Sequence, residues 1–395
     1  MKTQFADRMA ISHKSFIREI LKATEDPSVI SFAGGLPNPQ FFPVNEISKA
    51  ATKVFQDSGK ELLQYSTTEG YFPLRKFIAD RYLEKKGLFI DPDEILITNG
   101  SQQGIDLIGK IFLNKGDHVI IEKPGYLGAI QAFTTYEPTF HQIPLLEDGI
   151  ELELLEKTLK EYDCKLFYTV PNFQNPSGIS YSKEKRQQLA NLLKSYNTIL
   201  VEDDPYGELR FMGEDQPIIK QYLNDQTILL GSFSKIVAPG FRLGWLCAPK
   251  EILEKIIIAK QASDLHSSCV SQRIIYQHLC NHALDAHISK IGVAYKRQRD
   301  LMVAMIDRHF PEEVKYTKPE GGMFLWITLP EEISAMKLFE LAIHENVAFV
   351  PGNAFYVDGN GGNTLRLNFS NSDEVRIEEG MLRLAKAIKK LMLYR

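Results

Sequence analysis

Residues 231–242 combine one lysine, two serines and one arginine in a short stretch between two apolar runs that predict buried strands. A lysine on such a loop, flanked by small residues, can be held away from bulk water, where its amine loses proton affinity and can attack a carbonyl carbon. Lys235 stands in this position. Ser232, Ser234 and Arg242 suit a phosphate dianion, because arginine gives bidentate contacts and serine gives single ones.

A carbonyl-reactive lysine beside a phosphate cup is the combination that pyridoxal phosphate requires. The alternative interpretation is a solvated turn, since a lone Ser-x-Ser-Lys string is usually found in turns. The extension from Pro239 to Arg242 favours a binding site, and the other motifs of the chain must decide between the two.

A second phosphate-binding signal follows the predicted strand at residues 94–98, where the string Asn99-Gly-Ser-Gln-Gln-Gly opens a helix. Asn-Gly makes the tight turn, and the free amides at the start of a helix attract an anion. The alternative is that Ser101 only caps the helix. The two roles are compatible, because a cap serine beside free amides is already half of a phosphate site.

Two more predicted strands, 166–170 and 198–202, end in polar residues. Asn175 lies in the turn-rich string after the first strand and is a candidate donor into a crevice, with a plain loop as the alternative. Asp203 follows the second strand, where a carboxylate needs a partner, and a protonated pyridine nitrogen would suit it. Tyr206 could then hydrogen-bond the phenolic oxygen of the same ring.

Two alternatives stay open for the acidic residues here. Asp203 or Asp204 could cap a turn, or both could join Glu202 in binding Mg²⁺, which prefers clusters of oxygen ligands. The magnesium alternative lacks its phosphate partner, because the chain has no P-loop motif.

Arg366 is the remaining candidate, inside the predicted apolar strand at residues 364–368. Its guanidinium could form a fork for a substrate carboxylate, and the alternative is an arginine on a solvent face. His278 and His282 stand four apart on a predicted helix without the glutamate of a zinc-protease helix, which favours a surface or core pair. Neither Gly-x-Ser-x-Gly nor Gly-x-Gly-x-x-Gly occurs, so hydrolases and dehydrogenases are disfavoured.

The elements that would position these residues alternate between strand and helix from residue 94 to residue 202. Such alternation predicts a doubly wound, mostly parallel sheet with helices on both faces, in which ligands bind at the carboxyl ends of the strands. Long helical patterns follow, and then a smaller α+β region with a closing helix capped by Ser372. We predict an α/β fold with an N-terminal segment (1–44) joining the small domain, a large domain (45–285) and a small C-terminal domain (286–395).

Composition narrows the function classes. The 395 residues carry a net charge of −4 with both signs interspersed, so no nucleic-acid partner is expected. No apolar run reaches the roughly 18 residues of a membrane span, and the N-terminus lacks the apolar core of a signal peptide. The four cysteines show no paired spacing and predict reduced thiols in a cytoplasmic protein.

Taken together in chain order, these strings resemble the fold-type I pyridoxal-phosphate aminotransferases of class I/II. Within them, the chain looks most like the branch of 2-aminoadipate and kynurenine aminotransferases. The strings that carry the resemblance span nearly the whole chain: 31–37, 63–66 with 70–71, 99–103, 126–131, 171–178, 202–206, 232–242 and 365–368.

The resemblance implies that Lys235 binds the cofactor through a Schiff base and moves the proton during transamination. It implies that Asp203 pairs with the pyridinium nitrogen, that Tyr126 stacks on the ring, and that Asn175 and Tyr206 bond the ring's O3′ oxygen. Phosphate contacts are implied for Ser101, Gln102, Ser232, Ser234 and Arg242.

The same resemblance implies a homodimer with shared active sites, because Tyr65 would reach the phosphate of the neighbouring subunit. Arg366 would bind the substrate α-carboxylate, helped by Asn175 and the Gly35 backbone. Ser15 and Arg18, on the N-terminal helix, match the branch pattern. Arg18 would meet an acidic side chain such as that of glutamate or 2-aminoadipate, or else be an exposed arginine paired with a carboxylate.

The expected reaction is transfer of an amino group between an amino acid and a 2-oxo acid. Glutamate and 2-oxoglutarate form one expected pair, and a 2-aminoadipate, aromatic or branched-chain amino acid belongs to the other. One rival is β-elimination or decarboxylation at the same site. The other is a catalytically silent regulatory module, which would need an attached DNA-binding domain that we do not expect here.

Overall fold

The computed structural model describes residues 3–9, 20 and 26–393. Its largest sheet has eight strands in the order β2-β9-β8-β7-β6-β3-β4-β5. All strands run in one direction except β9 and β5, which pair antiparallel with their neighbours. The strands are β2 (Ile95–Thr98), β3 (His118–Lys123), β4 (Thr139–Leu146), β5 (Gly149–Ile150), β6 (Cys164–Thr169), β7 (Ile199–Asp203), β8 (Thr227–Ser232) and β9 (Gly244–Cys247).

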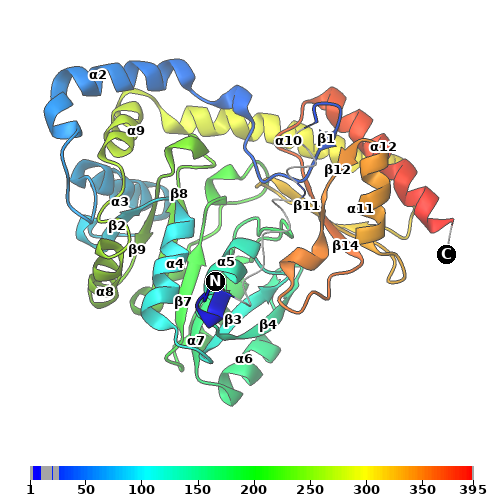
Figure 1. Ribbon diagram of the computed structural model, residues 1–395, viewed down its shortest axis with the longest axis horizontal. Helices are drawn as coiled ribbons and strands as arrows, with labels where there is room; N and C mark the ends of the chain where they lie inside the picture. Colours follow the sequence, from blue (N-terminus) through cyan, green and yellow to red (C-terminus); the bar gives the residue numbers. More distant parts are fainter. Residues whose placement is uncertain (1–2, 10–19, 21–25, 394–395) are drawn as a thin grey trace.

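Helices cover both faces of this sheet (Figure 1). Because successive strand residues point to opposite faces, Ile120, Phe167 and Leu200 pack in one core with α6 (Leu152–Glu161) and α7 (Lys183–Leu193). Their neighbours in sequence pack in the other core with α4 (Ser101–Phe112) and α5 (Leu127–Thr134). Burial on both faces explains why these strands are continuous apolar runs in the sequence. Further helices are α2 (Val44–Leu62), α3 (Phe72–Lys86), α8 (Lys250–Gln261) and α9 (Cys269–Asn281).

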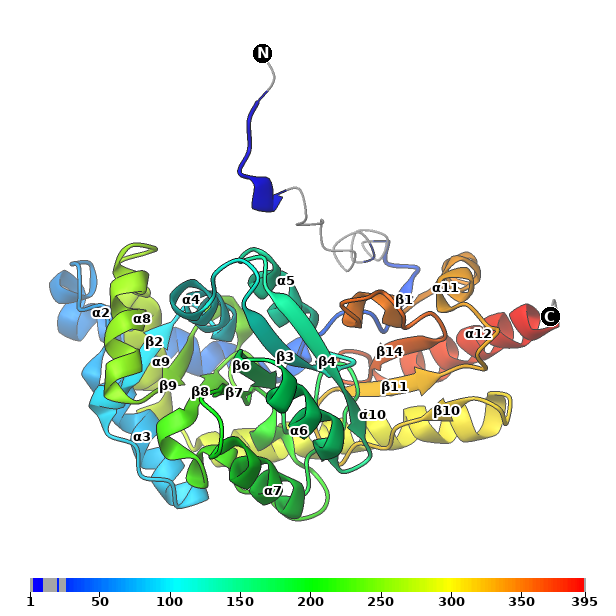
Figure 2. The ribbon, with the colours of Figure 1, turned by 90° about the horizontal axis from the view of Figure 1, so that it is seen from below.

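A smaller four-stranded antiparallel sheet, β10-β11-β14-β13, lies beside the large one. Helix α10 (Leu284–His309) runs along both sheets, and the described N-terminal residues extend away from the body (Figure 2). Strand β1 (Ile30–Ser31) pairs with β12 (Val347–Ala348). The remaining elements are β10 (Lys315–Tyr316), β11 (Phe324–Thr328), α11 (Ala335–His344), β13 (Val350–Pro351), β14 (Thr364–Asn368) and α12 (Glu374–Met392).

The predicted α/β fold with a smaller α+β part is confirmed, and the domain boundaries stay a prediction. Three details differ from expectation. The apolar residues 347–350, which by their pattern predict one strand, belong to two short strands in different sheets. The predicted Ser372 cap of the last helix is wrong by one residue, because the Asp373 side chain accepts from the Arg376 amide there. Strand β4 was not predicted, because only Ile143 of its eight residues is buried and Pro144 interrupts the apolar residues at its end.

Candidate active site

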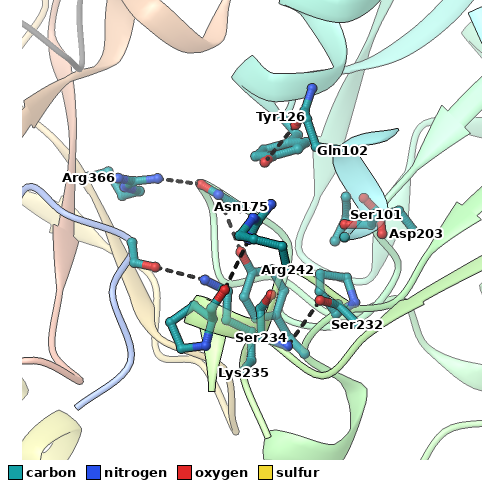
Figure 3. A pocket seen from close by; sticks show the side chains of 16 residues that line it. Ser101, Gln102, Tyr126, Asn175, Asp203, Ser232, Ser234, Lys235, Arg242 and Arg366 are labelled. Atoms are coloured by element: carbon teal, nitrogen blue, oxygen red, sulfur yellow. Dashed lines mark hydrogen bonds between the residues drawn. The ribbon is translucent and has the colours of Figure 1, made fainter. Parts of the chain in front are cut away.

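A cavity of about 350 Å³ opens at the carboxyl edge of the large sheet, where β2, β6, β7 and β8 end (Figure 3). This is the edge at which ligands bind in doubly wound sheets. Eleven of the predicted site residues line this one cavity: Gly35, Ser101, Gln102, Tyr126, Asn175, Asp203, Tyr206, Ser232, Ser234, Lys235 and Arg242. Arg366 lines it as well, from the smaller sheet.

Lys235 is half-buried in the loop after β8, and its ammonium donates to the Gly35 carbonyl oxygen over 2.9 Å. Burial lowers the pKa of Lys235 to about 8, and the positive charges of Arg366 and Arg242 add to the effect. A lysine with this pKa has a substantial fraction of neutral, nucleophilic amine near neutral pH.

Asp203 ends β7 and is 1% exposed. Its Oδ2 accepts a 2.6 Å hydrogen bond from the Tyr168 hydroxyl, whereas its buried Oδ1 has no hydrogen-bond partner among the described residues. Burial raises the pKa of Asp203 to about 7, against the lowering effect of the Tyr168 bond. A buried acceptor without a donor is costly, and it fits a ligand that brings a proton-bearing nitrogen into the cavity.

The turn between β2 and α4 forms the end of the cavity at which a phosphate is predicted to bind. Gly100 has a φ of +74°, and a Cβ there would lie 2.9 Å from Nη2 of Arg242, so only glycine lets the guanidinium lie against the turn. Ser101 is the first residue of α4 and makes no cap bond; Gly100 holds the cap position, so the cap-only alternative for Ser101 is not supported. The Ser232 hydroxyl accepts from the Ser234 amide over 3.1 Å, which ties two hydroxyl-bearing residues together.

The Tyr126 ring lines the cavity at the start of α5, and the Tyr168 ring lies beside it. Tyr126 and Tyr168 lie with their ring centroids 6.4 Å apart and their planes 22° from parallel. Burial raises the pKa of Tyr126 to about 12. The Gln102 amide donates to the Gly128 carbonyl over 2.8 Å, which orients Gln102 beside the Tyr126 ring.

Arg366 reaches the cavity from β14 and is 3% exposed, so the alternative of a solvent-facing arginine is wrong. Its guanidinium donates to Asn175 Oδ1 and to the Ala33 carbonyl, each over 2.7 Å. The Asn175 amide in turn donates to the Tyr206 hydroxyl over 3.4 Å. Burial lowers the pKa of Arg366 to about 10, and no carboxylate is among its described partners.

This arrangement suits a carboxylate ligand. A buried guanidinium that bonds only to neutral oxygens keeps its charge uncompensated, so an incoming carboxylate would gain a charge-assisted bond. The cavity therefore combines an amine that reacts with carbonyls, a buried acceptor for a ring nitrogen, a hydroxyl and guanidinium cup, and a cationic fork.

Comparison with known proteins agrees with this chemistry. The family model "Aminotransferase class I and II" matches residues 30–384. The chain belongs to this family. It is a pyridoxal-phosphate-dependent aminotransferase, and the donor set of the cavity fits that cofactor, because Asp203 Oδ1 has the place for a ring N–H and Ser101, Ser232, Ser234 and Arg242 have the chemistry for a phosphate.

Its relatives include proteins that match over nearly their whole length. The aminotransferase is 44% identical to "Aromatic-amino-acid aminotransferase 1" of Thermococcus litoralis, over 98% of this chain and 94% of that protein. It is 41% identical to "2-aminoadipate transaminase" of Thermus thermophilus, over 96% and 94%. A crystal structure of Pyrococcus horikoshii kynurenine aminotransferase, in complex with PMP, superposes with a TM-score of 0.94 at 45% identity, covering 98% of this chain and 97% of that one.

Three predicted site residues are not among those that line the cavity. Tyr65 is 79% exposed on the surface of the aminotransferase, where its ring meets that of His266 edge-on with centroids 5.9 Å apart. Ser15 and Arg18 lie outside the described residues.

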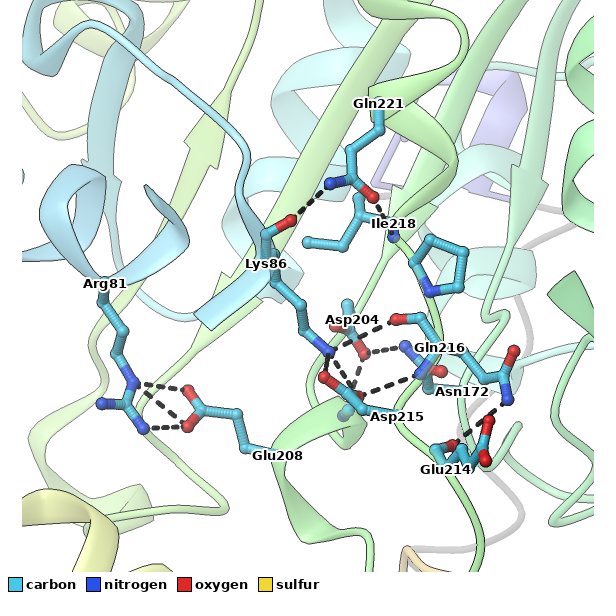
Figure 4. A network of polar contacts seen from close by, with 12 residues as sticks. Arg81, Lys86, Asn172, Asp204, Glu208, Glu214, Asp215, Gln216, Ile218 and Gln221 are labelled. Carbon is cyan, nitrogen blue, oxygen red and sulfur yellow. Dashed lines mark hydrogen bonds and ion pairs between the residues drawn. The ribbon is translucent and has the colours of Figure 1, made fainter. Parts of the chain in front are cut away.

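The three acidic residues at the end of β7, Glu202, Asp203 and Asp204, have three separate roles in the aminotransferase. Glu202 accepts the amides of Ile219 and Lys220, whereas Asp203 faces the cavity. Asp204 accepts from the Asn172 side chain and the Gly207 amide, each over 2.9 Å, so it is the turn cap (Figure 4). The three carboxylates thus have different partners, and in the described part of the chain no group of three or more His, Cys, Asp or Glu side chains is arranged to hold a metal.

Two residues that support the site were not predicted from the sequence. The Tyr168 hydroxyl on β6 donates a hydrogen bond to Asp203 on the neighbouring strand β7. The sequence feature that could have indicated this contact is a tyrosine on the strand next to the one that carries the carboxylate. Glu122 is fully buried near the end of β3 and holds the loop that carries Asn175. A glutamate at the end of an otherwise apolar run was the signal there. Its side chain accepts hydrogen bonds from Thr169, Gln174 and Tyr181.

Proposed function

We propose that this aminotransferase uses glutamate and 2-oxoglutarate as one substrate pair and a 2-aminoadipate, aromatic or branched-chain amino acid in the other half-reaction. The observation that carries the proposal is Arg366, a buried guanidinium at the cavity whose described partners are neutral. The names of relatives at 41–45% identity, which include aromatic-amino-acid, 2-aminoadipate and kynurenine aminotransferases, support the range of partners.

The roles of the site residues belong to the same proposal. Arg366 would bind the α-carboxylate, with Asn175 oriented between it and Tyr206, and the Gly35 backbone would complete that end. Lys235, with its pKa lowered to about 8, would take the proton from the Cα of the amino donor and, in the second half-reaction, deliver a proton to the Cα of the acceptor. The bound cofactor supplies the electron sink that makes this proton removable.

The remaining residues would hold and orient the cofactor. Asp203 Oδ1 would accept from the ring nitrogen, and Tyr168 would keep that carboxylate ionised and in place. Tyr126 would lie against the ring, and Asn175 and Tyr206 would bond its O3′ oxygen. The phosphate would be held by Ser101, Gln102, Ser232, Ser234 and Arg242.

A homodimer is also proposed, because the exposed Tyr65 has no place in the cavity of its own chain and would serve the phosphate of a neighbouring subunit. Ser15 and Arg18 are proposed to contact the substrate side chain. We further propose a cytoplasmic location, in keeping with four cysteines that are all free. No helix in the described ranges is long and apolar enough to cross a membrane.

The test is an absorbance spectrum of the purified protein before and after glutamate is added. We expect a visible band from the bound cofactor that moves to the near-ultraviolet as the amino group is transferred. A band that does not move would reject glutamate, and other amino donors would then be tried. Product analysis separates the rival reactions, because β-elimination releases pyruvate and ammonia whereas transamination yields a new 2-oxo acid.

A further inference from the structure

An ion pair between a buried lysine and a partly exposed aspartate lies behind the turn at residues 99–103. The Lys260 side chain, near the end of α8, is fully buried, and its ammonium contacts Asp264 Oδ1 over 2.8 Å and Oδ2 over 2.9 Å. It also donates to Gln103 Oε1 over 2.9 Å and to the Ser267 hydroxyl over 3.2 Å. Burying an ammonium is costly, so an ion pair retained at this position calls for a reason.

The Asp264 carboxylate connects this pair to the turn at residues 99–103. Its Oδ2 accepts from the Asn99 and Gln103 side-chain amides, each over 2.6 Å. Gln103 Oε1 closes the network by accepting from the backbone amide of Asn99 over 2.8 Å. All the described partners of this carboxylate are hydrogen-bond donors. An asparagine in place of Asp264 would therefore point its own N–H groups at one of these donors and lose that hydrogen bond.

The residues held in this way are next to those that line the cavity. Ser101 and Gln102 face the cavity from between Asn99 and Gln103, whereas Asp264 is not part of the cavity lining. Arg242 lies against Gly100 at 2.9 Å from the position of a Cβ, so a small movement of the turn would change its contact with the guanidinium. Asp264 can therefore act on a ligand only through the turn.

We propose that Asp264, charge-balanced by Lys260, is a positioning residue for the phosphate end of the active site. The inference rests on the proposed phosphate contacts of Ser101, Gln102 and Arg242. Holding the turn in its binding conformation before the ligand arrives would reduce the entropy lost on binding, so the pair would contribute to affinity for the phosphate and not to the recognition of the ring.

The experiment compares two probes on the full-length chain after its cofactor has been removed. Dissociation constants are measured for pyridoxal phosphate and for pyridoxal, which lacks the phosphate. Asp264→Asn should weaken the binding of pyridoxal phosphate by about tenfold or more, the equivalent of one hydrogen bond to a charged group. The dissociation constant for pyridoxal should change by less than about twofold. Asp80→Asn is the matched control, because Lys76 and Asp80 form the same i,i+4 pair at 2.9 Å on the surface.

A second variant guards against loss of folding. Asn99→Ala keeps the Lys260–Asp264 pair and the Gln103 bond, and removes only the 2.6 Å bond from the Asn99 side chain to the carboxylate. This variant should also bind pyridoxal phosphate more weakly and leave the binding of pyridoxal little changed, but the effect should be smaller.

Equal weakening of both probes in the two variants, or unchanged binding of pyridoxal phosphate in Asn99→Ala, would overturn the proposal. If the unmutated chain binds pyridoxal phosphate no better than pyridoxal, the phosphate contacts themselves are wrong, and the failure lies in the proposed function.

Discussion

The Lys235 ammonium donates a 2.9 Å hydrogen bond to the carbonyl oxygen of Gly35, which stands 200 positions earlier in the chain. The acceptor is neutral, so it does not compensate the charge, and burial together with Arg366 and Arg242 favours loss of the proton. The pKa of about 8 is thus a property of the assembled site.

Capture of the cofactor should depend on pH. Because only the neutral amine attacks a carbonyl, the rate at which the cofactor-free chain captures pyridoxal phosphate should rise with pH through about 8, from about one-tenth neutral amine at pH 7 to about nine-tenths at pH 9. Stopped-flow absorbance measures the rate, with N-acetyl-lysine as the reference for the cofactor's own titration. A rise centred near 10.5, the ordinary lysine value, would contradict the lowered pKa.

Lys235→Ala should abolish turnover, with a loss of at least about 10⁴-fold, because both the bond to the cofactor and the proton-transferring group are removed. The melting temperature of the cofactor-free variant should not fall, since a desolvated ammonium has been taken away. Activity assays and calorimetry check the two parts. Full activity in the variant would remove Lys235 from the mechanism.

Asp203 and Tyr168 should differ in the size of their effects. Asp203→Asn removes the charge that would keep the ring nitrogen protonated, and we expect a loss of at least about 100-fold in kcat. Tyr168→Phe removes one 2.6 Å bond to that carboxylate, which raises its pKa further, and should cost about tenfold. Steady-state kinetics at saturating cofactor measures kcat for each variant. Equal losses of kcat would contradict the expected difference between the two residues.

Arg366→Gln should raise KM for amino acids and 2-oxo acids by about 10- to 100-fold, because a bidentate, desolvated contact with the carboxylate is lost. Arg366→Lys should recover only part of the loss, since an ammonium cannot donate to Asn175, Ala33 and a substrate in the same planar geometry. Affinity for the cofactor is the control and should change little. A KM within about twofold of the original in Arg366→Gln would reject the carboxylate role.

Tyr65→Phe tests the proposed dimer. The Tyr65 ring rests edge-on against His266, and the Ser66 amide donates to His266 Nε2 over 3.3 Å, so the loop keeps its place when only the hydroxyl is removed. If that hydroxyl reaches a neighbouring subunit's phosphate, the affinity for pyridoxal phosphate should fall by about tenfold while sedimentation still shows a dimer. Unchanged affinity in a dimeric variant would leave Tyr65 as a surface residue.

Much of the fold could be predicted because burial on both faces leaves a continuous apolar run at each central strand, as in β8, and a three-to-four spacing over the whole of α10. The candidate site could be predicted in part for the same reason. Asp203 ends β7 and Lys235 stands three residues after the end of β8, and the carboxyl ends of parallel strands meet at one edge. Strand β4, near the sheet edge and only partly buried, had no comparable signal.

By itself, the sequence determined which residues carry chemistry and at which strand ends they stand, because these follow from local composition and from the rule of parallel sheets. Only the tertiary structure decided what each of them touches. The Tyr168 bond to Asp203, the Asn175 contact of Arg366 and the Asp264 contact of Asn99 join residues 35, 191 and 165 positions apart. Such contacts depend on the path of the whole chain and on the register between its strands and helices, which no local pattern specifies.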